Sequence, residues 1–200
     1  MNAKQQMMEQ IKGYLTSFNV LTEGFLGEFD KMVALNDYER GHYLLRQGKV
    51  SEHMHYIISG CVQCYIGTKE KKETLWFMKE GELAIFKNSF YDQSTSVGSI
   101  VALEDTKVLS ISYKDLELLY ENHPFLERTG RKITEFYHQR SDLKSYVLYP
   151  KKPAERFDRY YKYQSDMVNR IPQKQLASFL GMREETLSRL LQDKRKNNRS

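Results

Sequence analysis

Residues 173–192 read QKQLASFLGMREETLSRLLQ, which is the pattern of two short helices joined by a tight turn. The small Ala177 lets the two helices cross closely, and Gly181 can adopt the positive φ that a sharp turn between helices usually needs. The stretch therefore predicts a helix-turn-helix. The apolar side chains expected to face inward are Leu176 and Leu180 before the turn, and Leu187, Leu190 and Leu191 after it.

The polar residues of the second helix remain for its outer surface. A helix held in this way can enter the major groove of DNA, where arginine pairs with guanine and glutamate accepts a hydrogen bond from cytosine. Glu185 and Arg189 lie four residues apart, so they can read neighbouring base pairs, and in the free protein the same spacing predicts an ion pair between them. The candidate DNA-reading residues are Arg183, Glu184, Glu185, Thr186, Ser188, Arg189 and Gln192.

Basic residues are concentrated in the same part of the chain. Residues 151–200 hold 13 Lys and Arg against 6 Asp and Glu, a net charge of +7, whereas residues 1–150 hold 18 against 20, or −2. Such a segment suits a polyanionic partner, and each phosphate contact would add salt-dependent affinity without sequence information. The candidate phosphate contacts are Gln173, Lys174, Lys194, Arg195, Lys196 and Arg199.

The composition is that of a folded protein, because hydrophobic residues make up 40% of the 200 residues and charged residues 28%. The N-terminus lacks the apolar core of a signal peptide, and no apolar run is long enough to span a bilayer. The two cysteines, Cys61 and Cys64, are too few for a disulfide framework and fit a reducing compartment. We therefore expect a cytoplasmic protein.

The expected elements change along the chain from helices to strands and back to helices. Residues 1–35 have helical spacing, and from about 38 to 112 short apolar runs recur between turn signals, which is typical of a β sandwich or barrel. Ser112 is a candidate N-cap for a helix over 113–121, and Pro124 can begin a second helix that runs to about Leu148. Two prolines, Pro150 and Pro153, then mark a boundary before another helix at about 154–164.

The helix that begins at Pro124 carries a heptad-like seam, with members alternately three and four residues apart. This spacing favours a contact between two copies of the chain, although the same residues could pack on their own β domain. We interpret the seam as a dimer interface. Its members are Leu126, Thr129, Ile133, Phe136, Arg140, Leu143 and Val147, the threonine being its one uncharged polar member.

Several motifs resemble those of the Crp/Fnr family of bacterial regulators, in the family's order and over nearly the whole chain. The runs GHYLLRQG at 41–48 and HYIISG at 55–60 are similar to its first β-roll strands. EGE at 80–82 resembles the start of the phosphate-binding cassette, and LED at 103–105 the loop before the last strands. LASFLGM and ETLSR, within residues 176–189, resemble its helix-turn-helix.

The resemblance implies an α+β chain in three parts. These are a double-stranded β-helix (β-roll) sensor domain at 1–123, a dimerisation helix at 124–149 and a helix-turn-helix domain at 150–200. It implies a sequence-specific transcription regulator whose partners are double-stranded DNA, a second copy of the chain, RNA polymerase and a small-molecule effector. The alternative is a sensor or protein-interaction module that does not read DNA. No nucleophile–base set stands out, so we expect no enzyme.

Two departures from the family matter. Members that bind cyclic AMP hold its phosphate with an Arg-Ser pair, whereas residues 93–98 read QSTSVG and Lys87 is the only nearby cation. Burying an anion without such a partner costs several kcal/mol, so we do not expect a cyclic nucleotide. The candidate effector pocket is Gly81, Glu82, Ser94 and Ser96. In addition, only eight residues follow Gln192, too few for the strand pair of a wing.

The sequence patterns for metal, redox, iron–sulfur and haem sites are incomplete. His53 and His55 would share one face of a strand, as in cupin metal sites, but residues 57–60 supply no glutamate to complete a triad, so we expect no metal. Cys61 and Cys64 lie three apart in an expected strand and point to opposite faces, unlike a redox pair. Residues 1–40 contain no cysteine for an iron–sulfur cluster. Haem stays open, with five His and eight Met present.

Overall fold

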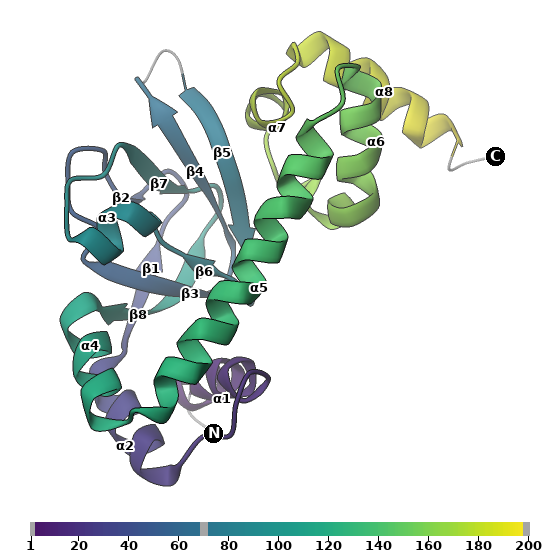
Figure 1. Cartoon of the computed structure of the whole chain (residues 1–200). Coiled ribbons are helices and arrows are strands. Elements are labelled where there is room, and N and C mark those ends of the chain that lie inside the picture. Colours follow the sequence, from purple (N-terminus) through teal and green to yellow (C-terminus); the bar gives the residue numbers. More distant parts are fainter. Residues whose placement is uncertain (1–2, 69–71, 198–200) are drawn as a thin grey trace. The chain divides into compact units, whose positions relative to one another are not determined.

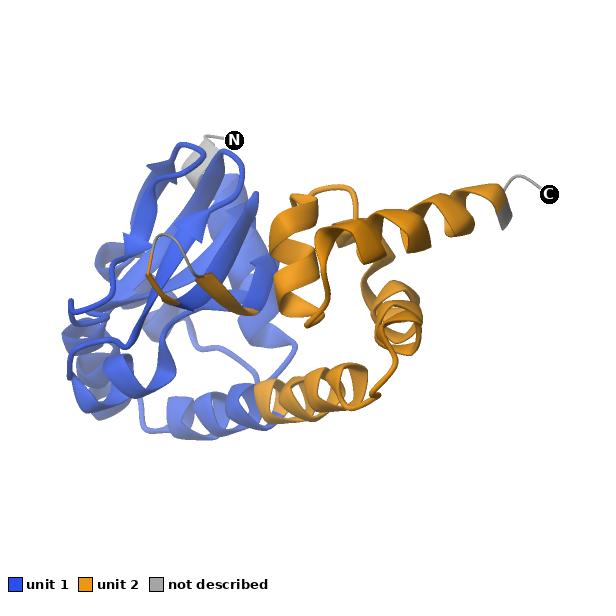
Figure 2. Cartoon of the chain, turned by 90° about the horizontal axis from the view of Figure 1, so that it is seen from above, with its two compact units in different colours: residues 1–66, 76–135 blue, residues 67–75, 136–200 orange. Residues whose placement is uncertain are grey.

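The computed structural model of the chain describes residues 3–68 and 72–197, and these fall into two compact units (Figure 2). Unit 1 spans residues up to 66 together with 76–135, and unit 2 spans 67–75 together with 136–200. Helix α5 (Phe125–Leu148) and strand β5 (Lys72–Lys79) each contribute residues to both units.

Unit 1 is built on two four-stranded sheets. The pairs β1–β8, β8–β3, β3–β6, β2–β7 and β7–β4 are antiparallel. These sheets, with helices around them, confirm the expected α+β fold with a β-roll. In spatial order, one sheet contains β1 (Ala34–Tyr38), β8 (Thr106–Ser112), β3 (His53–Ser59) and β6 (Leu83–Ala84), and the other contains β2 (Tyr43–Leu45), β7 (Gly98–Ala102), β4 (Cys61–Gly67) and β5.

Helices α1 (Ala3–Thr16), α2 (Glu23–Met32) and α4 (Tyr113–Asn122) gather beside β3 and β8 (Figure 1). Ser112 caps α4, as the sequence predicted, because its side chain accepts a hydrogen bond from Asp115 N at 3.0 Å. The helices bury one face of the sheet. The core there includes Phe25, Phe29, Tyr56, Ile58, Leu109, Ile111, Leu119 and Leu126.

Strand β3 is covered on both faces, so its burial does not alternate. Tyr56 and Ile58 belong to the core beneath the helices, and since successive side chains of a strand point to opposite faces, His55 and Ile57 face the other way. Strand β4 is covered in the same manner. The expectation that Cys61 and Cys64 point to different faces therefore agrees with both being fully buried, free thiols.

A close approach of two backbones requires a glycine between β3 and β4. Gly60 has φ +98°, and a Cβ there would lie 2.7 Å from the carbonyl oxygen of Asp105. Its N–H donates to Glu80 Oε1 at 2.7 Å. The turn is therefore tied to two other loops of unit 1.

Unit 2 contains the end of α5, then α6 (Pro153–Gln164), the short 3-10 helix η1 (Ser165–Met167), α7 (Gln173–Phe179) and α8 (Glu184–Asn197). Helices expected at 113–121, from Pro124 to Leu148 and at 154–164 are confirmed to within one residue at each end. Within this unit, Ser178 Oγ accepts a hydrogen bond from Thr74 N at 3.3 Å and donates to Lys72 O at 3.1 Å. The fully buried side chains of the unit include Phe157, Met167, Leu176, Leu180 and Leu187.

Two strands and one helix of the structure were not predicted from the sequence. Strand β1 begins at Ala34, inside the stretch expected to be helical, and carries Asn36 and Asp37, which are poor strand formers. It forms only because β8 pairs with it. Strand β6 and helix α3 (Lys87–Asp92) lie in the segment that was interpreted only as a cassette. None of the described helices is both long and apolar enough to span a bilayer.

Candidate functional site

The turn between α7 and α8 has the geometry expected of a helix-turn-helix. Gly181 adopts φ +62°, and the N–H of Met182 donates to Ala177 O at 3.0 Å. Ala177 is 3% exposed, so the small side chain lies where the two helices approach each other. The residues predicted to control the turn therefore act as expected.

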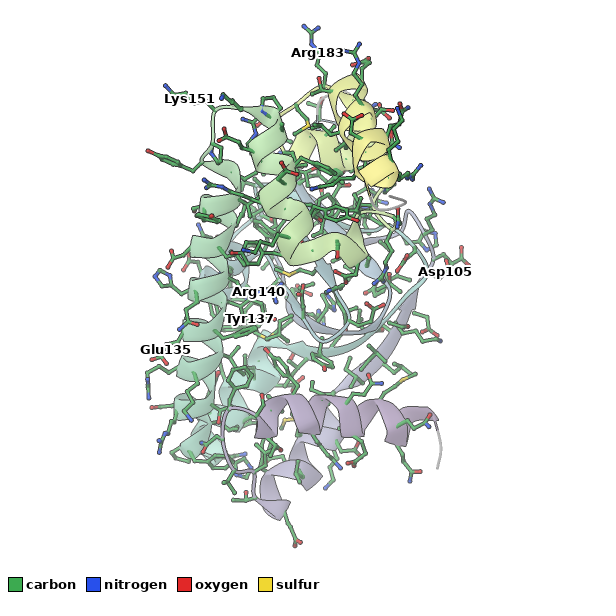
Figure 3. The ribbon with its side chains drawn as sticks, turned by 90° about the vertical axis from the view of Figure 1, so that its right-hand side faces the viewer. Asp105, Glu135, Tyr137, Arg140, Lys151 and Arg183 are labelled. Carbon is green, nitrogen blue, oxygen red and sulfur yellow. The ribbon has the colours of Figure 1, made fainter. Side chains whose placement is uncertain are left out.

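The leucines of the motif hold α8 from beneath. Leu176, Leu180 and Leu187 are fully buried, Leu191 is buried and Leu190 is half-buried. On the other side, Arg183, Glu184, Glu185, Arg189 and Gln192 are exposed, with Thr186 and Ser188 half-buried. Arg183 lies immediately before the first residue of α8 and its side chain points away from the ribbon (Figure 3).

The expected ion pair between Glu185 and Arg189 is not formed in the described part of the chain, so that prediction is wrong. Both side chains are exposed, and an exposed pair gains little because water screens the attraction while two flexible side chains lose freedom. The consequence is that both remain available to a ligand.

Arg156 of α6 holds the turn from behind. Its guanidinium donates to Leu180 O through Nε at 2.6 Å and to Gly181 O through Nη2 at 2.9 Å. Its Nη1 donates to Pro150 O and Lys151 O at 2.7 and 2.9 Å. One side chain thus joins the turn of the motif to the segment between α5 and α6. Arg156 was not predicted from the sequence, since nothing local marks an arginine that bonds residues 24 and 25 positions away.

The candidate phosphate contacts divide into two groups. Gln173 and Lys174 at the start of α7, and Arg195 and Lys196 near the end of α8, are exposed. Lys194 instead pairs with Asp158 of α6 at 2.9 Å, and its Nζ lies 5.5 Å from the centre of the Tyr161 ring. In the absence of DNA, the Lys194 ammonium is therefore paired with the Asp158 carboxylate of the same chain. Arg199 lies outside the described residues.

The seam on α5 is partly covered by the chain itself. Leu126 belongs to the core of unit 1, and Thr129 and Val147 are 2% and 4% exposed. Ile133, Arg140 and Leu143 are half-buried, and Phe136 is 36% exposed. Glu135 and Tyr137, outside the seam, leave the helix on opposite sides (Figure 3). The stretch left for a partner is therefore shorter than the sequence indicated, running from Ile133 to Leu143.

The side chains of Gln93 and Ser96 in the cassette bond the backbone of their own turns. Gln93, with φ +47°, ends α3 and donates from Nε2 to Phe90 O at 2.6 Å. Ser94 is exposed and its carbonyl accepts from Ser89 Oγ, whereas Ser96 is buried and its hydroxyl donates to Gly98 O at 2.9 Å. Gly81 and the buried Glu82 form the turn before β6. The four candidate pocket residues thus belong to two separate turns.

A cavity of about 270 Å³ lies elsewhere in unit 1, along β2, the loop after it and the start of β3. At its base, His55 Nδ1 lies 2.7 Å from Ser110 Oγ, and the rings of His53 and His55 are stacked. Burial, with a smaller contribution from His53, lowers the pKa of His55 to about 3. Among the described residues, no group of three or more His, Cys, Asp or Glu is placed to hold a metal ion. The cavity is lined by Tyr43, Leu44, Leu45, Arg46, Lys49, Val50, Ser51, Glu52, His53 and His55.

Residues 35–123 match the family of cyclic nucleotide-binding domains. No curated protein is significantly similar to the chain in sequence. Among solved structures, CLP of Xanthomonas campestris, described as a c-di-GMP responsive global regulator, is similar with a TM-score of 0.68 and 19% identity over 88% of this chain and 93% of that one.

Two further structures are similar. FixK2 of Bradyrhizobium japonicum has a TM-score of 0.69 and 15% identity, over 83% of this chain and 86% of that one. The sensor domain of the transcriptional regulator DNR from Pseudomonas aeruginosa has a TM-score of 0.55 and 25% identity, over 71% of this chain and 95% of that domain. Residues 35–123 therefore resemble cyclic nucleotide-binding domains, and the chain has the fold of the Crp/Fnr regulators, as its motifs indicated.

Proposed function

We propose that the chain is a sequence-specific DNA-binding transcription regulator that acts as a homodimer. The observation that carries the proposal is the division of α8 into two faces. Buried leucines hold the helix, while Arg183, Glu185 and Arg189 are exposed and form no ion pair within the described residues. Side chains of these types can read guanine and cytosine in the major groove.

The surroundings of α8 supply the sequence-independent part of binding. Lys174 precedes it on α7 and Arg195 follows near its end, both exposed in a segment of net charge +7. Two copies related by a two-fold axis would place two reading helices on half-sites about one helical turn of DNA apart, roughly 34 Å. The target is then a palindromic duplex.

The proposal is tested by selecting duplexes from a genomic fragment library with the full chain and measuring affinity by fluorescence anisotropy over a series of salt concentrations. Glu185→Ala and Arg189→Ala are expected to lose selectivity between the selected duplex and a scrambled one. Lys114→Ala, an exposed lysine of α4, is the control and should bind as the wild type does. A wild-type chain that binds no duplex selectively would refute the proposal and favour an interaction module that does not read DNA.

The dimer is tested separately on α5. Phe136→Glu places a charge in the part of the seam that the chain leaves accessible, and should convert the dimer to a monomer in sedimentation velocity while lowering DNA affinity. His138→Glu, which adds the same charge at an exposed position of α5, should leave the dimer intact. A monomeric wild-type chain would contradict the proposed homodimer, and dimers of both variants would place the interface elsewhere.

The proposal does not include regulation by cyclic AMP. The cassette contains no arginine, and the polar side chains of Gln93 and Ser96 are held by their own turns. Cyclic AMP should therefore leave the melting temperature of the full chain unchanged. A marked rise in melting temperature on adding it would contradict this part of the proposal.

A further inference from the structure

We propose that the cavity formed by β2, the loop after it and the start of β3 is a binding site for a small anion that carries a carboxylate or phosphate group. The site is distinct from the cassette, since none of Gly81, Glu82 and Ser94 lines it. The proposal goes beyond DNA reading and does not depend on it.

The charge at the mouth of the cavity favours an anion. Arg46 and Lys49 are exposed lining residues, against one acidic residue, Glu52. The Arg46 guanidinium carbon lies 3.9 Å from the centre of the Tyr43 ring, so the aromatic face holds the cation in place. A preorganised guanidinium is a strong partner for carboxylate and phosphate oxygens.

The loop that carries these cations is anchored at several points. Ser96 N donates to Lys49 O at 2.9 Å, and Gly48 N donates to Ser96 O at 2.8 Å. Ser51 N donates to Ser89 Oγ at 2.8 Å, and Tyr113 N donates to Glu52 O at the same distance. The cavity is therefore built into the fold of unit 1, and a ligand would not have to order the loop first.

The base of the cavity presents polar atoms that lack a protein partner. Ser51 and His55 are 3% and 5% exposed, and Ser51 Oγ and His55 Nε2 make no hydrogen bond within the described part of the chain. Neither atom is among the fully buried side-chain atoms that lack a partner, so each keeps some contact with solvent. Both atoms belong to residues that line the cavity, so a ligand or water placed there would satisfy them.

The protonation of His55 suits a hydrogen-bond donor. Asn36 Nδ2 donates to Ser110 Oγ at 2.9 Å, and the Ser110 hydroxyl can donate its own proton to His55 Nδ1. In that tautomer the imidazole proton lies on Nε2. Because burial holds the pKa of His55 near 3, the ring is neutral at physiological pH, and it can donate one hydrogen bond to an anion without placing a charge in the core.

The size of the cavity limits the ligand. At about 270 Å³ it lies just below the roughly 300–1,000 Å³ typical of drug-sized ligands. Leu44, Leu45 and Val50 supply an apolar wall beside the cations. The site therefore fits either an inorganic oxyanion or a small organic acid whose apolar part lies against this wall.

The test is an NMR titration of the full chain, without DNA, with inorganic phosphate, with benzoate and with benzamide, the uncharged counterpart of benzoate. At least one of the two anions should bind and shift the ring signals of His53 and His55 but not those of the exposed His138. The double variant Arg46→Gln/Lys49→Gln should weaken that binding about tenfold or more, because it removes both charge-assisted partners. Both replaced side chains are exposed, so the backbone spectrum should keep its folded pattern.

Lys87→Gln is the matched control, because Lys87 is an exposed cation of the cassette that does not line the cavity. Binding of phosphate alone would identify a free oxyanion, and binding of benzoate alone an organic acid. The proposal is overturned if neither anion shifts the two histidines, if benzamide binds as tightly as benzoate, or if Lys87→Gln abolishes binding. Since the readout involves no DNA, a failure here is distinct from a failure of DNA binding.

Discussion

Helix α8 and the cassette segment at 80–98 are both rich in polar residues, but they use them in opposite ways. On α8 the arginines and glutamates are exposed above a layer of buried leucines. In the cassette, Gln93 and Ser96 bond the backbone of their own turns, and Glu82 is 5% exposed. The first region offers its polar groups to a partner, whereas the second uses them to hold its own shape.

This difference indicates where the specific chemistry of the chain lies. A turn needs hydrogen bonds for its own backbone whether or not it binds a ligand. A motif can therefore keep its fold without the side chains that would bind the ligand. A reading helix has no such internal use for an exposed arginine. Under the proposed function, the exposed side chains of α8 read DNA, and the proposed anion site lies in the cavity beside β2 and β3 instead of in the cassette.

The largest expected effect is on the support of α8. Arg156→Ala removes four hydrogen bonds from one guanidinium and should lower the free energy of unfolding of unit 2 by about 3 kcal/mol, with a loss of DNA affinity. Arg156→Lys should recover only part, since an ammonium cannot span the same carbonyls. Chemical denaturation followed by circular dichroism measures the effect. Glu155→Ala, an exposed control on the same helix, should change stability by less than about 0.5 kcal/mol, and equal effects of the two variants would contradict the role of Arg156.

The next prediction separates base contacts from phosphate contacts. Arg183→Ala should weaken binding to the selected duplex by about 10- to 100-fold, corresponding to about 1–3 kcal/mol, and change binding to a scrambled duplex little. Lys174→Ala should weaken both duplexes alike and reduce the slope of log affinity against log salt by about one. Anisotropy titrations at several salt concentrations distinguish the two. If Arg183→Ala weakened both duplexes equally, Arg183 would be a phosphate contact.

The third prediction concerns His55 in the core of unit 1. His55 has a pKa near 3 in the folded chain, against an ordinary value of 6.5, so below pH 6.5 the unfolded chain binds a proton that the folded chain does not. Its contribution is complete above pH 6.5 and is lost as the pH falls towards 3. Between pH 8 and pH 5, the wild type should lose about 2 kcal/mol more stability than His55→Gln. Urea denaturation at both pH values checks this, and an equal loss in the two proteins would show that His55 is protonated in the folded state.

The smallest expected effect tests the engagement of Lys194. Asp158→Asn removes its partner at 2.9 Å, so Lys194 becomes available to a phosphate and one negative charge is lost. DNA affinity at low salt should rise about two- to fivefold, for selected and scrambled duplexes alike, with stability changed by less than about 1 kcal/mol. Asp142→Asn, an exposed position of α5, serves as the control for charge alone. A rise confined to the selected duplex would place Lys194 against a base instead.

The helices of the chain were predictable because their signals are local. Ser112, Pro124, Pro150 and Pro153 are caps or breakers whose effect depends on neighbouring residues, and the boundaries they predicted agree with the structure to within one residue. The strands were harder. Strand β3 is covered on both faces, so it lacks the alternation that identifies a strand, and β1 depends on its pairing with β8.

The candidate sites divide in the same way. Positions facing outward on α8 follow from helical periodicity, so the sequence predicted which polar side chains of that helix are exposed. It could not find that Leu126 lies in the core of unit 1, that Lys194 is paired with Asp158, or that Arg156 supports the turn. Each of these depends on elements that are distant in the chain.

The sequence by itself determined the helix-turn-helix, its small residue and glycine, the basic charge around it and the order of the parts, because spacing and composition act over a few residues. Only the tertiary structure decided which of those residues remain available. Burial lowers the pKa of His55, which lines a cavity together with Ser51, Arg46 and Lys49. In the cassette, the Ser96 hydroxyl donates to a backbone carbonyl of its own turn. Dielectric environment and the satisfaction of polar groups depend on everything packed around a residue, which a linear pattern does not record.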